Sequence, residues 1–276
     1  AIVEAGDLAP ADKAIYALRD TTGTVDSLPL IGSSIVSKKV ATGAGYLLYD
    51  VKRGSGAFMK STEDARNLAE LLVRLSEDLK IKASALITDM DNPLGNAVGN
   101  ALEVRESVSL LKNEPVPEDL TDEVNHVATR LLELKGIPDA ATAVEKALTS
   151  GAAYEKFRQF VGAQGGDIGA LEDLPISAEV REVRSPRDGY VARFAASGIG
   201  SAALALGAGR ARKGDEIDPG SGVEVLVRAG DHIRRDQPVA RLYGEREAER
   251  AGRLVLQALE LSDEPVERPP AILDSL

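Results

Sequence analysis

The sequence predicts an α/β protein built from three consecutive parts. Between residues 46 and 88, short apolar runs and a helical pattern follow in the order strand, glycine loop, helix, strand, which is typical of a parallel sheet with a right-handed crossover. A helical pattern precedes this region, and short β-like runs separated by glycine and proline follow it. We therefore expect a remnant of a small helical domain (8–45), a mostly parallel α/β sheet domain with following helices (46–170), and a C-terminal α+β module with a small β-sandwich-like part (171–276).

Composition narrows the class of protein. The 276 residues, 43% of them hydrophobic, suffice for a sizeable core. The formal net charge of −11, without a basic stripe, argues against a nucleic-acid partner. The chain has no cysteine, and its two histidines lack carboxylates at metal-ligand spacing, so a disulfide framework, a Cys or His metal site and a Ser-His-Asp hydrolase are not expected. No run is apolar enough to span a bilayer and no signal segment begins the chain, so we expect a cytoplasmic protein without a membrane partner.

Two helices are predicted in the first part. Pro10 suits the first turn of a helix that runs through Leu18, since proline lacks only an N–H that has no partner there. Pro29 begins a second helix, with Gly43 as its C-terminal cap. Residues 1–3 look like the end of a buried strand, so the sequence reads as the continuation of something longer.

The middle part is predicted to alternate strands and helices. Strands are expected over 46–51 and 81–88. A helix capped by Ser61 lies between them and should bury leucines at helical spacing, namely Leu68, Leu71, Leu72, Leu75 and Leu79. A helix is expected over 97–111, and further helices fill about 120–163. These carry an apolar stripe that is interpreted as core: Leu120, Val124, Val127, Leu131 and Leu134.

The last part is predicted to alternate strands with turns. Its expected strands cover 178–183, 189–194, 223–227 and 238–243. Helices are expected over 200–206 and 245–261, followed by an irregular tail over 264–270.

Three polar residues near the start suggest a ligand site. Ser34 and Lys38 stand four residues apart and share one face of a helix, while Arg19 lies on the segment just before. Three such donors can converge on one electron-rich planar ring. Taken singly, a residue of any of these types on a helix is a solvated surface group far more often than a ligand.

Three blocks around these residues resemble the pyrimidine-nucleoside phosphorylase and thymidine phosphorylase family. They read YALRDTTGTVDSLPLIGSSIVSKK (16–39), DVKRGSGAFM (50–59) and TDMDNPLGNAVGNALEVRE (88–106). The third block, with its Pro-Leu-Gly, is more similar to the pyrimidine-nucleoside phosphorylases. The resemblance implies reversible phosphorolysis, in which uridine or thymidine and phosphate give a free base and a pentose 1-phosphate.

The resemblance also assigns roles to residues at the base. It implies that Arg19 and Lys38 contact the carbonyl oxygens of the base and that Ser34 contacts the region of its ring nitrogen. Tyr16 is similar to the family's tyrosine near base and sugar. The apolar base-pocket positions match Val25, Ile31 and Phe58, for which plain core packing remains an alternative.

The resemblance further implies that the protein binds a monovalent cation. The family's cation ligands correspond to the carbonyl oxygens of Leu94 and Ala97 and to the carboxylate of Glu106, a set that suits a weakly held hard ion such as K⁺. For Glu106 a solvated helix face is the alternative. No organic cofactor is implied, phosphate is the co-substrate, and the full-length protein is expected to be a homodimer.

The family's phosphate-binding glycine loop and its Gly-Gly-Thr motif lie upstream of the matched region. The resemblance therefore implies the C-terminal two thirds of a phosphorylase, with an incomplete phosphate site. Two alternatives stay open: a non-catalytic fragment or binding module, and an anthranilate-type phosphoribosyltransferase, which should lack the Ser-x-x-x-Lys pair. Preference for uridine or thymidine is left open.

Overall fold

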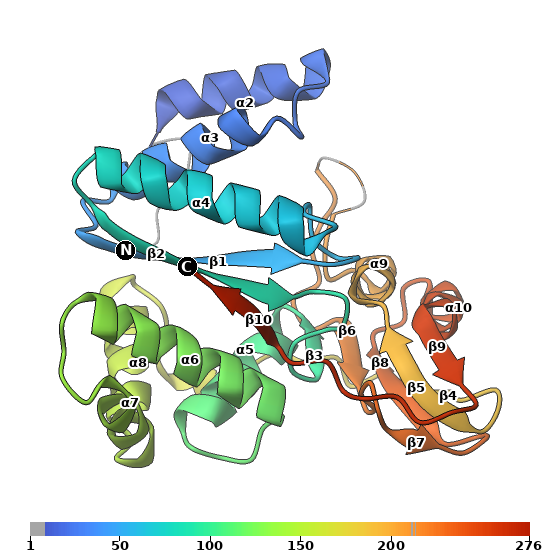
Figure 1. The fold of residues 1–276 in the computed structure, drawn as a ribbon. Helices are drawn as coiled ribbons and strands as arrows, with labels where there is room; N and C mark the ends of the chain where they lie inside the picture. The colour runs from blue at the N-terminus through green and yellow to red at the C-terminus, as the bar shows by residue number, and fades with distance from the viewer. Residues whose placement is uncertain (1–8, 211, 213) are drawn as a thin grey trace. The chain divides into compact units, whose positions relative to one another are not determined.

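The computed structural model describes residues 9–210, 212 and 214–276, which form two compact units (Figure 1). The first unit holds the described residues up to Asp89, with Glu123–Glu145 and Ile272–Leu276; the second holds Met90–Asp122 and Lys146–Ala271. The units alternate along the chain, whereas the sequence predicts three consecutive parts with boundaries after residues 45 and 170. Strand pairing between segments far apart in the sequence is one reason, and the helical segment Glu123–Glu145 packs with the first unit as well. The strand end expected over residues 1–3 lies outside the described residues.

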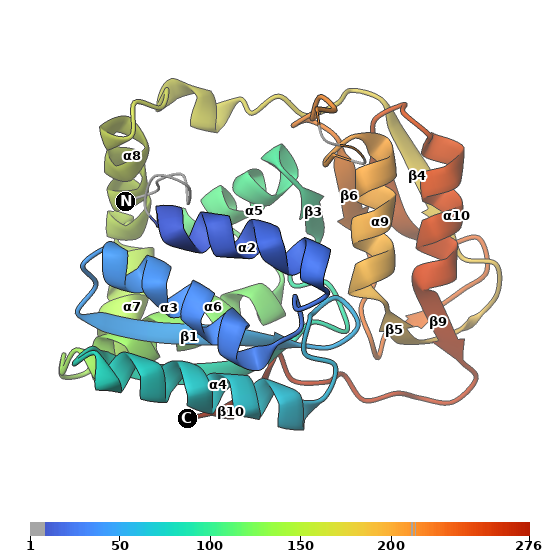
Figure 2. The same cartoon turned by 90° about the horizontal axis from the view of Figure 1, so that it is seen from above.

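The first unit begins with the two predicted helices. They are α2 (Pro10–Thr22) and α3 (Leu28–Ala41), each with a proline in its first turn. Gly23, with φ of 64°, ends α2, and Gly43, with φ of 72°, follows the end of α3. Both glycines adopt the left-handed conformation that terminates helices. Figure 2 shows α2 lying along α3.

The sheet of the first unit confirms the predicted strand, helix, strand order. Strand β1 (Tyr46–Arg53) runs parallel to β2 (Lys82–Asp89), and α4 (Thr62–Asp78) connects them. The Ser61 hydroxyl accepts the Asp64 N–H at 3.1 Å and so caps α4 as expected. Strand β10 (Ile272–Ser275) pairs antiparallel with β2 and was not predicted. The sheet is therefore mixed, and the tail before β10 is irregular as expected.

The core of the first unit lies between this sheet and helices α3 and α4. Its buried members include Val36, Leu47, Tyr49, Val51, Leu68, Leu72, Ile81 and Ile87. Leu79, expected on the buried face of α4, is 53% exposed because the helix ends one residue before it.

Helices follow β2 largely as predicted, with two corrections. The elements are β3 (Ala97–Gly99), α5 (Ala101–Leu111), α6 (Glu118–Leu134), α7 (Ala140–Thr149), α8 (Ala152–Ala163) and the short 3₁₀ helix η1 (Gly169–Glu172). Residues 97–99 were expected to be helical but pair antiparallel with a strand of the last part. The stripe on α6 is only half buried, and Leu131 is 39% exposed. The buried residue of α6 is Glu123, so the face of this helix that packs inward carries a charge.

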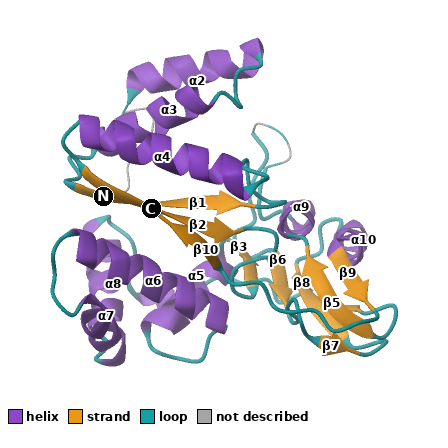
Figure 3. Ribbon diagram, viewed as in Figure 1, coloured by secondary structure: helices purple, strands orange, loops and turns teal. Residues whose placement is uncertain are grey.

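The last part forms two antiparallel sheets and two helices within the second unit (Figure 3). Its elements are β4 (Val180–Arg184), β5 (Gly189–Phe194), α9 (Ala196–Leu206), β6 (Gly222–Val225), β7 (His232–Ile233), β8 (Pro238–Tyr243), α10 (Ala248–Ala258) and β9 (Leu259–Ser262). The strand orders are β3-β6-β8-β4 and β7-β5-β9.

The four strands predicted here are present. The helix predicted over 245–261 is too long, because its last residues become extended at Leu259 and pair with β5 as β9. Helices α9 and α10 lie side by side, and a core that includes Phe194, Ile199, Leu206 and Ile233 fills the unit. The α/β class is confirmed. Among the described residues, no helix has both the length and the apolar character that crossing a bilayer requires.

Candidate functional site

The predicted Ser34 and Lys38 pair is brought together on α3. The Lys38 Nζ donates a hydrogen bond to the Ser34 Oγ at 2.9 Å. Ser34 is buried, with 6% of its surface exposed, whereas 30% of the Lys38 side chain is exposed. The hydroxyl is thus held by the ammonium group, and the lysine head remains within reach of a ligand.

Arg19 lies in the last turn of α2, and its buried side chain faces the loop that leads to α3. Its Nε donates to the Thr24 carbonyl at 3.3 Å and its Nη1 to the Leu30 carbonyl at 3.4 Å, and its Nη2 donates to the Val25 carbonyl. The guanidinium carbon is 5.1 Å from the centre of the Tyr16 ring. Arg19 therefore ties α2 to the interhelical loop and to the first turn of α3 through its Nε, Nη1 and Nη2 groups.

Asp12 joins this cluster and was not predicted. Its Oδ2 lies 2.8 Å from the Lys38 Nζ, and only 11% of its side chain is exposed. Burial alone would raise the pKa of the Asp12 carboxyl, but hydrogen bonds with Lys38 and Ser34 and the charges of Lys38 and Arg19 outweigh it and lower that pKa. The carboxylate is therefore ionised at neutral pH. Its spacing to Tyr16 and Arg19, four and seven residues, places all three on one face of α2 and is the signal that could have revealed it.

The apolar candidates have different surroundings. Ile31 packs against the core of the first unit, which favours the packing alternative for it. Val25 is half buried, and its carbonyl accepts from Arg19. Tyr16 is 43% exposed and Phe58 is 73% exposed, so neither is a core residue.

Phe58 projects from the compact glycine loop that follows β1. Gly54 donates to the Met59 carbonyl at 3.0 Å and accepts from Ala57 at 3.1 Å. The φ of Gly54 is 137°, a conformation that other residues rarely adopt. The loop closes on its own backbone, and this leaves the Phe58 ring on the surface.

A second charged cluster lies at the carboxyl ends of β1 and β2. The Lys52 Nζ lies 2.5 Å from a Glu123 oxygen and 2.8 Å from an Asp50 oxygen, while Thr88 donates to Asp50. Burial lowers the pKa of Lys52, but the two carboxylates overcome this and raise it above its ordinary value. The sequence pattern did not single out this cluster, although Asp50 and Lys52, two residues apart on a strand, point to the same face.

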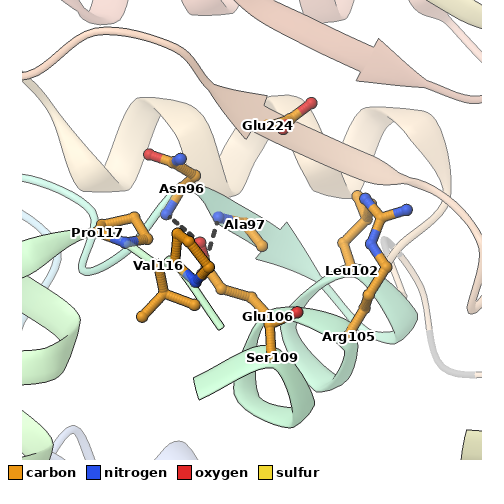
Figure 4. A pocket seen from close by; sticks show the side chains of 10 residues that line it. Asn96, Ala97, Leu102, Arg105, Glu106, Ser109, Val116, Pro117 and Glu224 are labelled. Carbon is orange, nitrogen blue, oxygen red and sulfur yellow. Dashed lines mark hydrogen bonds between the residues drawn. The ribbon is translucent and has the colours of Figure 1, made fainter. Parts of the chain in front are cut away.

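Glu106, the candidate cation ligand, is bound to backbone (Figure 4). Its two carboxylate oxygens accept the N–H groups of Asn96 at 2.8 Å and Ala97 at 3.2 Å. It lines a cavity of about 210 Å³ with Arg105 and Glu224. Each carboxylate oxygen keeps a further lone pair, so the Glu106 carboxylate is compatible with a weakly held hard cation, whose binding here stays a prediction. Among the described residues, no group of three or more His, Asp or Glu side chains is placed to hold a metal ion.

Replacing Glu106 by alanine is expected to lower the free energy of unfolding by about 1–3 kcal/mol, because two backbone N–H groups lose their acceptor. Urea denaturation measures the change. Glu103, one turn earlier, is exposed and accepts a single N–H from Gly99, so Glu103→Ala should cost less. Equal losses in the two variants would contradict the structural role of Glu106.

Two family descriptions cover most of the chain. Residues 2–154 match "Glycosyl transferase family, a/b domain", and residues 190–262 match "Pyrimidine nucleoside phosphorylase C-terminal domain". The chain belongs to the pyrimidine-nucleoside phosphorylase family. The resemblance of the three motif blocks is thereby confirmed.

Curated relatives agree with this family. A pyrimidine-nucleoside phosphorylase of Bacillus subtilis (strain 168) is 44% identical over 253 residues, which are 89% of this chain and 58% of the relative. One from Geobacillus stearothermophilus is 39% identical over 281 residues, 99% of this chain and 65% of the relative. One from Staphylococcus epidermidis (strain ATCC 12228 / FDA PCI 1200) is 42% identical over 249 residues, 88% of this chain and 57% of the relative. The chain thus spans between 57% and 65% of the length of these relatives.

Proposed function

We propose that this chain carries the base-recognising part of a pyrimidine-nucleoside phosphorylase, which converts uridine, thymidine or deoxyuridine and phosphate reversibly into the free base and the (deoxy)ribose 1-phosphate. This proposal rests on the cluster formed by Arg19 on α2 and by Ser34 and Lys38 on the neighbouring helix α3. Membership of the family supports the reaction class.

The chemistry of the bond explains why such donors are useful. As the glycosidic bond breaks, positive charge develops on the sugar and negative charge on the departing pyrimidine. Donors fixed before the reaction stabilise that anion more than the neutral nucleoside, and so they lower the barrier. Lys38 and Arg19 donate to the carbonyl oxygens of the base, and Ser34 faces the ring nitrogen.

Other residues are given roles in the proposed function. Tyr16 and Phe58, both exposed side chains, flank the base and sugar. Val25 and Ile31 contribute apolar surface. A monovalent cation such as K⁺ takes the carbonyl oxygens of Leu94 and Ala97 and the carboxylate of Glu106. In the full-length enzyme, phosphate is held by residues outside the matched blocks, and two copies form a homodimer.

Phosphate-dependent release of uracil from uridine tests the function. The native polypeptide that carries this sequence is first identified by mass spectrometry and then assayed with and without phosphate, with thymidine as a second substrate. Release that requires phosphate supports a phosphorylase. No release from either nucleoside contradicts it and favours a non-catalytic binding module. An anthranilate-type phosphoribosyltransferase would instead consume anthranilate and phosphoribosyl pyrophosphate.

A further inference from the structure

We propose that Asp12 is a positioning residue of the base site, which holds Lys38 and, with it, Ser34 in the orientation that faces the departing pyrimidine. This inference rests on the proposed function. It names a residue that no part of the resemblance assigned.

The geometry links two helices through three side chains. The Asp12 carboxylate on α2 lies 2.8 Å from the Lys38 Nζ on α3, and that Nζ lies 2.9 Å from the Ser34 Oγ. An ammonium group has three N–H donors in a tetrahedral arrangement. With two of them directed at Asp12 and Ser34, the direction of the third is fixed, and this N–H is available to a base oxygen.

Fixing the lysine head matters because its stem is long. A free lysine side chain has about 2 kcal/mol of rotamer entropy to lose when it binds a ligand. In this chain the ion pair with Asp12 restricts the side chain before the ligand arrives, and such preorganisation lowers the cost of binding and of reaching the transition state. The Asp12 side chain is only 11% exposed, so its carboxylate is largely shielded from water, while the Lys38 side chain, 30% exposed, remains accessible.

The charges of the cluster fit the same role. Arg19 and Lys38 contribute two positive charges and Asp12 one negative charge. The three together retain one positive charge, which matches the single negative charge of a departing pyrimidine. Asp12 thus orients a cation without cancelling the attraction for the anion.

A simpler role for Asp12 would be to join α2 to α3. The two roles differ in how the effect of a substitution depends on the leaving group. The fluorine of 5-fluorouridine withdraws electrons from the base, so that its anion needs less stabilisation. If Asp12 orients the donors that stabilise the anion, its loss should harm uridine more than 5-fluorouridine. If it only joins helices, both substrates should suffer equally.

The test is Asp12→Asn in the native polypeptide that carries this sequence. We expect kcat/KM for uridine to fall about 10- to 100-fold, the effect of misplacing a group by about an ångström. The loss for 5-fluorouridine should be several-fold smaller, and KM for phosphate should stay unchanged. Asp12→Glu, which keeps the carboxylate, should recover part of the activity. Asp78→Asn, the same substitution at an exposed site at the end of α4, is the matched control and should leave the rates unchanged.

The results of these assays distinguish a failure of the positioning role from a failure of the proposed function. Equal losses with both nucleosides, or Asp12→Asn rates within twofold of the unmodified protein, would overturn the positioning role while leaving the proposed function intact. Absence of phosphate-dependent uracil release from the unmodified protein would overturn both. Thermal unfolding of each variant shows whether it is folded, and the ratio of the two substrates remains informative for a variant of lowered stability, since it compares rates within one preparation.

Discussion

Replacing Lys38 by alanine is expected to lower kcat/KM for uridine phosphorolysis about 100- to 1000-fold, the cost of removing one preorganised donor from a developing anion. The ammonium group sits 2.9 Å from Ser34 and 2.8 Å from Asp12. Its loss removes the group that holds the Ser34 hydroxyl and, with it, the proposed donor to the base. Initial rates of uracil release at varied uridine and saturating phosphate measure the effect.

Lys39 provides the matched control for this experiment. It follows Lys38 on the same helix and is exposed. Lys39→Ala changes the net charge by the same amount, so any general electrostatic effect on substrate approach appears in both variants. We expect its rate to remain within about twofold of the unmodified protein, as for most surface substitutions. A Lys38→Ala rate equally close to the unmodified value would refute the role assigned to Lys38.

Lys38 is a cleaner probe than Arg19. The Arg19 guanidinium donates to the Thr24, Val25 and Leu30 carbonyl oxygens. Its removal would release the interhelical loop together with any contact to the base, so that activity and stability would fall together. The Lys38 head makes side-chain contacts within the cluster, and its alanine variant keeps the buried backbone bonds of that loop.

Local signals predicted the first helices and the parallel strand pair well. Proline at the start of α2 and α3, glycine after their ends, and the Ser61 cap of α4 act within a few residues. Apolar runs long enough for one strand flank a helical pattern, and β1, α4 and β2 follow from them. Such features depend on neighbours in the sequence, which is why they are visible there.

Features that depend on distant partners were missed. Residues 97–99 are compatible with a helix start, but they form β3 because β6 pairs with them in antiparallel register, Ala97 opposite Glu224. Strand β10 exists through its pairing with β2. A short segment has little intrinsic preference, and tertiary pairing decides its conformation.

In the candidate site too, contacts between residues close in the sequence could be predicted, and contacts between distant segments could not. The Ser34 and Lys38 spacing predicts their contact, since residues four apart meet on a helix. The role of Asp12 was not predicted from the sequence, because its partner Lys38 lies on another helix. The Lys52 cluster escaped because Glu123 is 71 residues away, and a charge on the buried face of α6 runs against the apolar stripe that marked that helix as core packing.

Lys52→Met is expected to lower the free energy of unfolding by about 2–4 kcal/mol, because it removes the cation shared by two carboxylates in a largely buried setting. Glu123 is only 7% exposed, and Lys52 and Asp50 are each 31% exposed. Urea denaturation at neutral pH measures the loss. Lys82→Met, at an exposed position on β2, is the control, and its cost should stay within about 0.5 kcal/mol.

The pH dependence of this difference identifies its electrostatic origin. The folded protein raises the pKa of Lys52 above its ordinary value of 10.5, since the attraction of Asp50 and Glu123 exceeds the opposing effect of burial. A group whose pKa is raised on folding contributes its full stabilisation below the unfolded value and loses it as the pH rises through the folded value. The stability gap between the unmodified protein and Lys52→Met should therefore be constant near neutrality and narrow above about pH 10.5. Titrations common to both proteins cancel in this difference. A gap that persists unchanged in alkali would mean that the lysine stem stabilises the unit by packing, and that its charge does not.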